Sequence, residues 1–382
     1  MNNNSYIPQP SLSFIDIKAN KKQDNIWKEL EGGIWRNFDI QSYLDNNLLL
    51  PQQKHLQKPV FSEILQIEPG VLYDGNTKQL KLDLYYPKDI KSDFNLFISA
   101  AEHFFSNLNA KRIGVHLSGG LDSSIIISLL RYLDIPFVPI GLYSETFEFR
   151  TERRIQEKLL EWGEDGELIA IEEFPFYSGI KAIPKHQIPC GLFKGYAGSM
   201  ALAKAFHKKG CDVVLTGQGG DSLFVESSEN ILARGFNIGD EFMNGEEIDL
   251  VYQPYGIRLV SFYSSQNLID IIVNERKGQK EDALKWWARK WMKDLLIPEL
   301  SEYAYFADFL GLTMWGLHNS LPDIKELLEE ASDFLHNPIF FSKNIRKFIS
   351  QDIYSFEHKD YIKFCGLISI AVWLHSLHYY NA

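Results

Sequence analysis

Residues Val115–Leu130, VHLSGGLDSSIIISLL, decide the fold. An apolar run leads into a short polar loop with two adjacent glycines, and a second apolar run with helical spacing follows. This order predicts a buried strand, a tight turn, and a helix whose amino-terminal end faces the turn. Such a unit is typical of a parallel β-sheet covered by helices.

The same alternation continues along the chain from about residue 97. Alternating strands and helices predict an α/β fold with a parallel sheet, in which ligands bind at the carboxyl ends of the strands. The predicted helices cover 96–108, a stretch that begins near Asp122, 151–163 and 199–210, and the predicted strands cover 113–117, 137–144, 167–173 and 212–217.

Two regions flank this pattern. Beyond about residue 249 the strand signal fades into helical periodicity, at 282–296, 324–335 and 364–380. Before residue 96 the character is mixed and rich in proline, which predicts a small α+β appendage. We therefore predict an appendage at 1–95 and a main domain at 96–382, with a helical subdomain from about 249.

Composition excludes several classes of protein. The net charge of −11 argues against a broad surface for nucleic acid, because such surfaces are basic. The cysteines Cys190, Cys211 and Cys365 are far apart and form no CxxC pair, so they support neither a disulfide framework nor a zinc site. The first ten residues lack a signal-peptide pattern, and no uninterrupted apolar run is long enough to span a bilayer. We expect a cytoplasmic protein.

The first glycine loop has the chemistry of an anion site. Its glycines allow close backbone approach to a ligand, and the following helix adds the positive end of its dipole. Asp122 would repel a bare phosphate, which suggests an intervening Mg²⁺. The alternative is a glycine turn with a Ser and Asp helix cap, but the complete string between strand and helix favours a nucleotide site. The predicted nucleotide-binding residues here are Leu117, Ser118, Gly119, Gly120, Asp122, Ser123 and Ser124.

A second glycine loop, GQGGDS at 217–222, ends the predicted strand 212–217. It repeats the combination of close backbone approach and one carboxylate, at Gly217, Gly219, Gly220 and Asp221. Alone it fits a structural turn equally well, but its place on a strand of the same sheet favours a site. Asp122 and Asp221 are therefore predicted to share a metal. No GxxxxGK[ST] motif occurs, so a Walker loop is not the explanation.

SGGLDSS, followed about a hundred residues later by VVLTGQGGDSLF, resembles the synthetase domain of asparagine synthetase, β-lactam synthetase and lasso-peptide cyclase. These amide-forming PP-loop ATP pyrophosphatases use ATP and Mg²⁺ to convert a carboxylate into an acyl-adenylate, which an amine then attacks. The resemblance implies that the first loop binds pyrophosphate and that Asp122 and Asp221 act in catalysis by ligating Mg²⁺. It places Gly141 under the adenine.

The resemblance extends from about Val60 to the end of the chain. Residues 60–87 resemble the end of the family's glutamine-amidotransferase domain, which would here be a truncated remnant. The family's glutaminase uses a cysteine after the initiator methionine, and Asn2 at that position implies that glutamine is not hydrolysed. FCGLISIAVWLHSL at 364–377 resembles the last helix of lasso cyclases.

Three positions depart from the family. Gln218 lies where the loop composition follows how the amine is handled, and glutamine can orient a ligand but cannot act as a base. It is a candidate catalytic residue. Ser222 replaces an acidic residue of the asparagine enzymes. Phe306 aligns with the catalytic lysine, and a phenyl ring cannot replace an ammonium group. The lysines considered as substitutes are Lys277, Lys280 and Lys343.

Three functions remain open. The first is ATP-dependent amide formation that cyclises a carboxylate-bearing peptide or specialised metabolite, with a possible peptide-processing partner protein. The second is amidation by free ammonia, which Gln218 and Ser222 disfavour. The third is a catalytically impaired ATP-binding or scaffold homologue, which Phe306 favours.

Overall fold

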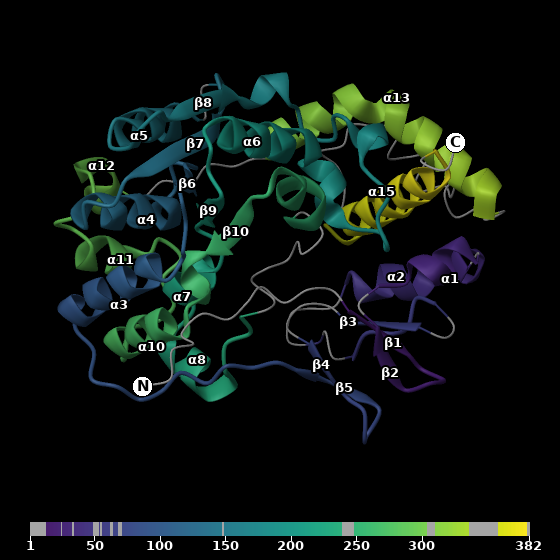
Figure 1. Cartoon of the computed structure of the whole chain (residues 1–382), viewed down its shortest axis with the longest axis horizontal. Helices are drawn as coiled ribbons and strands as arrows, with labels where there is room; N and C mark the ends of the chain where they lie inside the picture. The colour runs from purple at the N-terminus through teal and green to yellow at the C-terminus, as the bar shows by residue number, and fades with distance from the viewer. Residues whose placement is uncertain are drawn as a thin grey trace.

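The centre of the molecule is a five-stranded parallel sheet with the order β10-β9-β6-β7-β8 (Figure 1). The computed structural model describes residues 13–23, 25–32, 34–48, 53, 56–61, 64–67, 71–146, 149–238, 248–303, 310–335 and 358–379. The strands are β6 (Ile113–His116), β7 (Phe137–Tyr143), β8 (Glu167–Ala170), β9 (Val213–Thr216) and β10 (Arg258–Ser261). The predicted α/β fold with a parallel sheet is confirmed.

The direction of the chain reverses between β6 and β9. From β6 it runs outward to β7 and β8, and it then returns to add β9 and β10 on the other side of β6. The two strands pair in parallel, with Ile113 opposite Val213. Neighbouring strands with diverging connections leave a crevice at their carboxyl ends. Both glycine loops begin there.

Helices cover the sheet because its strands are apolar on both faces, as parallel sheets require. Val214 and Leu215 of β9, for example, are fully buried. The helices around the sheet are α3 (Phe94–Ser106), α4 (Leu121–Tyr132), α5 (Arg150–Leu160), α6 (Tyr196–Lys208), α7 (Gly220–Val225), α8 (Ser228–Arg234), α10 (Gln266–Glu275), α11 (Trp286–Trp291) and α12 (Pro298–Glu302).

Two predictions for the region beyond residue 249 are wrong. Residues 258–261 form β10, whereas only helices were expected there. A strand of four residues, RLVS, is too short for a period of two to stand out. The helix predicted over 282–296 is only α11, because Lys285 has a left-handed backbone with φ 54° and ends the preceding turn.

Trp287 and Trp291 of α11 pack against the core, whereas Trp286 is 37% exposed and was wrongly expected there. The rings of Trp287 and Trp291 lie 4.7 Å apart, and Trp291 lies 4.7 Å from Phe97 of α3. Their helical spacing therefore reflects packing.

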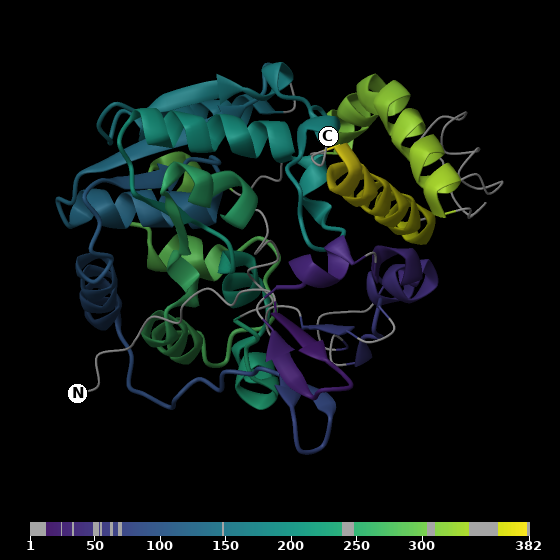
Figure 2. The same ribbon diagram turned by 45° about the vertical axis from the view of Figure 1, so that its right-hand side comes forward.

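The carboxyl-terminal helices and the amino-terminal region lie beside the sheet (Figure 2). Tyr43 Oη lies 3.0 Å from Ser369 Oγ, and the rings of Phe38 and Trp373 are 5.0 Å apart, so the two ends of the chain share a core. A carboxyl-terminal helical region and a small amino-terminal α+β appendage were predicted, and the structure shows that the strands of the appendage pair in antiparallel fashion. The elements are β1 (Ser13–Asp16), β2 (Lys21–Gln23), α1 (Trp27–Glu31), α2 (Ile40–Asn46), β3 (Ile64–Ile67), β4 (Val71–Asp74), β5 (Gln79–Leu82), α13 (Leu310–Leu335) and α15 (His358–Tyr379).

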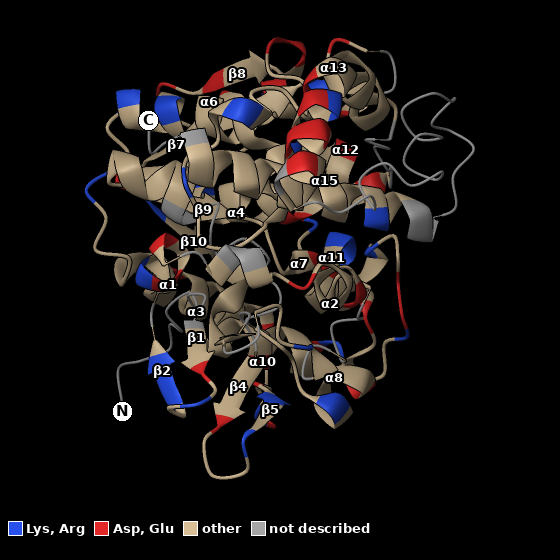
Figure 3. Cartoon of the chain, turned by 90° about the vertical axis from the view of Figure 1, so that its right-hand side faces the viewer, with Lys and Arg blue, Asp and Glu red and all other residues tan. Residues whose placement is uncertain are grey.

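Helix α15 is apolar because most of it is buried inside the protein. Among the residues that the structure describes, its Tyr361–His378 window is the one helical stretch long and apolar enough to cross a bilayer. Of that window, 72% is buried inside the protein, as in the core helix of a globular fold. Figure 3 shows basic and acidic residues interspersed along the ribbon as seen from this side.

Gly141 lets the first loop cross the end of β7. A Cβ atom at this position would lie 1.9 Å from the carbonyl oxygen of Leu117. A 2.8 Å hydrogen bond from the Leu117 N–H to the Ile140 carbonyl holds the start of the first loop close to β7. A side chain at residue 141 must therefore push the loop away from the sheet.

We expect Gly141→Ala to lower the free energy of unfolding by about 2 to 3 kcal/mol, because the clash involves backbone that cannot rotate away. Urea denaturation measures this change. Gly191→Ala is the matched control, because a Cβ atom there meets nothing within 4 Å. Equal stability of the two variants would contradict this account of the loop.

Candidate functional site

The two glycine loops touch at Asp122, in the first turn of α4. A Cβ atom at Gly220 would lie 2.4 Å from the Asp122 Cγ, and one at Gly217 would lie 2.9 Å from the backbone nitrogen of Ser123. Only glycine permits this approach. The structure thus brings together two loops that lie about a hundred residues apart, as the sheet topology requires.

The first loop is stabilised by its own serines. The Ser118 hydroxyl accepts a hydrogen bond from the Gly120 N–H at 3.1 Å and lies 2.8 Å from the Ser123 hydroxyl. Ser123 and Ser124 donate to the Gly120 carbonyl at 3.2 and 2.7 Å. Gly119 takes a left-handed φ of 79°, which turns the chain into α4. The hydroxyls shape the loop, and their predicted contact with pyrophosphate stays a prediction.

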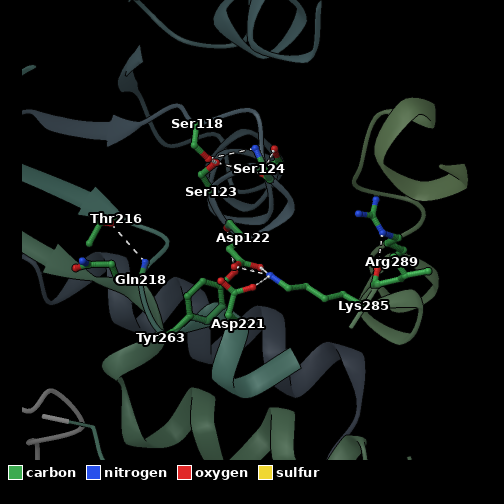
Figure 4. A network of polar contacts seen from close by, with 12 residues as sticks. Ser118, Asp122, Ser123, Ser124, Thr216, Gln218, Asp221, Tyr263, Lys285 and Arg289 are labelled. Atoms are coloured by element: carbon green, nitrogen blue, oxygen red, sulfur yellow. Dashed lines mark hydrogen bonds and ion pairs between the residues drawn. The ribbon is translucent and has the colours of Figure 1, made fainter. Parts of the chain in front are cut away.

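A lysine lies between the two aspartates (Figure 4). Lys285 Nζ is 2.8 and 2.7 Å from the two carboxylate oxygens of Asp122 and 2.5 Å from Asp221 Oδ1. These three contacts can use all three protons of the ammonium group. The side chains of Asp122 and Lys285 are only 15% and 12% exposed, whereas that of Asp221 is 83% exposed. Burial raises the pKa of Asp122 to about 6, although the neighbouring Lys285 ammonium lowers it.

Asp122 and Asp221 fit a divalent cation. Their oxygens converge on a single cation position, and carboxylate oxygens are the ligands that Mg²⁺ prefers. Among the described residues, no cluster of three or more His, Cys, Asp or Glu side chains could hold a metal. A cation held by these two carboxylates would therefore need further oxygen ligands, such as water or a bound phosphate.

Lys285 is the site residue that sequence reasoning missed. Its partner Asp122 is 163 residues away, and no local pattern distinguishes it among the 39 Lys and Arg residues. Of the substitutes considered, Lys277 instead contacts Asp89 at 2.5 Å. Lys280 is exposed and lies outside any helix, strand or turn. Lys343 lies outside the described residues.

Two further residues frame the carboxylates. Tyr263 donates a hydrogen bond to the Asp122 carbonyl at 3.0 Å. The Gln218 carbonyl accepts one from Ser261 of β10 at 2.7 Å, which joins the second loop to the edge strand. The side chain of Gln218 is exposed and points away from the Asp122, Asp221 and Lys285 cluster (Figure 4). Its catalytic role stays a prediction. Phe306, where the family lysine was expected, lies outside the described residues.

A pocket of about 230 Å³ opens beside the first loop, at the ends of β6 and β7. Pockets for whole small-molecule ligands usually measure about 300–1,000 Å³, so this one suits part of a ligand, such as a flat base. Gln156 fixes its shape by donating to the carbonyls of Leu117 and Leu142 at 2.9 and 2.8 Å. Its mainly apolar walls include Leu117, Gly141, Phe149, Phe176, Leu202 and Leu312.

The titratable groups of this pocket tend to be neutral. Burial lowers the pKa of His116 to about 4, and His116 Nε2 lies 2.8 Å from the Tyr252 hydroxyl. Burial also raises the pKa of Glu152 to about 7. Below neutral pH the walls therefore carry little charge, which suits an uncharged base better than a phosphate.

Three comparisons with known proteins gave one family match, at the residues that form the site. A family model described as asparagine synthase matches residues 108–319, which include both glycine loops and Lys285. A search of the curated proteins found no match. Among solved structures, an NMN synthetase from Francisella tularensis aligns at 15% identity over 56% of this chain and 97% of its own, with a TM-score of 0.27. A score this low does not support any inference about function.

Glu152 makes the stability of the protein depend on pH. The folded protein binds this proton more tightly than the unfolded chain does, so its stability falls as pH rises from about 4 to about 7. We expect Glu152→Gln to remove this loss. At about pH 8 the free energy of unfolding of the variant should be about 1 to 2 kcal/mol higher than that of the wild type. The difference is modest because the Glu152 side chain is only half-buried and solvent screens part of the effect.

Urea denaturation across this pH range measures the difference, which should vanish near about pH 4. Glu161→Gln, at an exposed position just after the same helix, is the control. A wild type whose stability rises between about pH 4 and pH 7 relative to Glu152→Gln would contradict the assignment.

Proposed function

We propose that this chain, which belongs to the asparagine synthase family, activates a substrate carboxylate with ATP and joins it to an amine of the same molecule. Membership confirms the resemblance drawn from the loops, and it makes the chain an ATP-dependent ligase that forms C–N bonds. The observation that carries the proposal is the convergence of Asp122 and Asp221 on one cation position, between a glycine loop and an apolar pocket.

Each part of ATP has a matching part of the site. The apolar pocket suits the adenine, with Gly141 in its wall. The loop at 118–120 and the amino-terminal end of α4 suit the phosphates, because backbone N–H groups and the helix dipole favour anions. Asp122 and Asp221 would hold Mg²⁺, which when bound neutralises charge on the leaving pyrophosphate.

The proposed reaction has two steps. The substrate carboxylate attacks the α-phosphorus of ATP, and the bond to pyrophosphate breaks to leave an acyl-adenylate. The amine then attacks the acyl carbon, AMP leaves, and the amine gives up a proton. Gln218 cannot take that proton near neutral pH, although it can orient the amine by hydrogen bonds.

The proposed substrate is a peptide or a specialised metabolite that becomes cyclic. Support comes from residues 364–377, which resemble the last helix of lasso cyclases, and from Gln218 and Ser222, which depart from the ammonia-using enzymes. A second candidate function is nucleotide binding without amide formation, which Phe306 favours because it aligns with the family lysine.

The mass of the product separates these functions. Loss of one water from the substrate indicates cyclisation, and replacement of a hydroxyl by an amino group indicates amidation by ammonia. ATP binding without release of pyrophosphate, across a panel of peptide and small-molecule carboxylates, supports the second candidate.

Asp122→Asn tests the site itself. We expect release of pyrophosphate and AMP to fall at least about 100-fold, because metal stabilisation of the leaving group contributes several kcal/mol. A coupled pyrophosphate assay measures the rate. Asp165→Asn is the matched control, since that carboxylate is 61% exposed and pairs with Arg112 away from the site. Unchanged turnover in Asp122→Asn would show that the assignment is wrong.

A further inference from the structure

We infer that Lys285 keeps divalent cations out of the Asp122 and Asp221 pair until a nucleotide binds. The inference rests on the proposed function, because it concerns when the predicted metal site becomes available. In this role the Lys285 ammonium neutralises the carboxylates of Asp122 and Asp221, and a nucleotide-bound metal ion later takes its place.

The ammonium group and a metal ion compete for one position. Lys285 Nζ lies within 2.8 Å of three carboxylate oxygens, two from Asp122 and one from Asp221. Mg²⁺ binds carboxylate oxygens at about 2.0–2.1 Å, so an ion bridging the same aspartates would lie where Nζ now lies. The two cations cannot occupy this space together.

Charge makes the exchange depend on a nucleotide. Asp122 and Lys285 are both largely buried, and a buried charge that loses its partner is strongly unfavourable. A free metal ion could satisfy the carboxylates but would leave the Lys285 ammonium without an anion. Bound triphosphate removes this obstacle, because it carries the metal in and offers phosphate oxygens to the displaced ammonium.

The backbone holds Lys285 in place for this task. Its φ of 54° is a left-handed conformation that non-glycine residues rarely adopt, and such strain concentrates at functional sites. Lys285 N–H donates to the Asp282 carbonyl at 3.0 Å, and Asp282 N–H donates to the Val225 carbonyl at 2.9 Å. Val225 ends α7, the helix that carries Asp221 in its first turn. The lysine is therefore anchored to the element that presents one of its partners.

Binding of Mn²⁺ without nucleotide tests the inference, with electron paramagnetic resonance as the readout. We expect Lys285→Gln to bind Mn²⁺ at least about tenfold more tightly than the wild type, a typical size for coupling between ligands at one protein. Lys285→Arg retains the charge and should behave like the wild type. Lys290→Gln, at an exposed position of α11, the helix that follows Lys285, is the control and should also behave like the wild type.

Further variants identify the site. Adding Asp221→Asn to Lys285→Gln should abolish the gained Mn²⁺ affinity, and persistence of that affinity would overturn the inference. So would a wild type that binds Mn²⁺ as tightly as Lys285→Gln. Circular dichroism checks folding, and Lys285→Met serves as a second neutral variant of similar length.

Amine labelling of the wild type gives a test that needs no variant. We expect Mn²⁺ alone to leave the labelling of Lys285 unchanged, and Mn²⁺ with α,β-methylene-ATP to change it. A change with Mn²⁺ alone overturns the inference. Both readouts are independent of turnover, so a failure to release pyrophosphate would count against the proposed function and leave the metal test intact.

Discussion

The pairing of β6 with β9 is the constraint on which the site depends. These strands are neighbours although about a hundred residues separate them, and their connections leave in opposite directions. Each strand ends in a glycine loop, so one crevice receives both loops and one aspartate from each. Gly217 and Gly220 then allow contact that any side chain would prevent. The chemistry of the site follows from sheet topology before any catalytic group is considered.

Local patterns predicted much of this arrangement from the sequence. The strand and helix periods around 113–132 and 212–217 placed both loops at the same edge of the sheet, and the loop residues then nominated Asp122 and Asp221. Strand β10 was not predicted, because four residues are too few to show the alternation of apolar and polar residues that marks a strand. Lys285 was missed for a different reason. Its function depends on carboxylates far away in the chain, and its left-handed backbone lies inside a run whose apolar spacing continues into α11.

The site combines buried charge with one open side. Asp122 and Lys285 are enclosed, whereas Asp221 remains largely exposed. Enclosed charges are strongly coupled because little water screens them, and the exposed carboxylate gives an incoming ligand access to the cluster. The apolar pocket on the other side of the first loop provides a separate surface for an uncharged part of the ligand.

Leu117 belongs both to the wall of the pocket and to the start of the first loop, and its backbone is held firmly against the sheet. Its N–H is bonded to Ile140 and its carbonyl to Gln156, so the residue that walls the pocket cannot move independently of the sheet. The fold therefore fixes the distance from the pocket to Asp122. This distance limits the length of any ligand that contacts both. In the proposed function, this spacing would favour ligands whose base and reactive phosphorus are separated as they are in ATP.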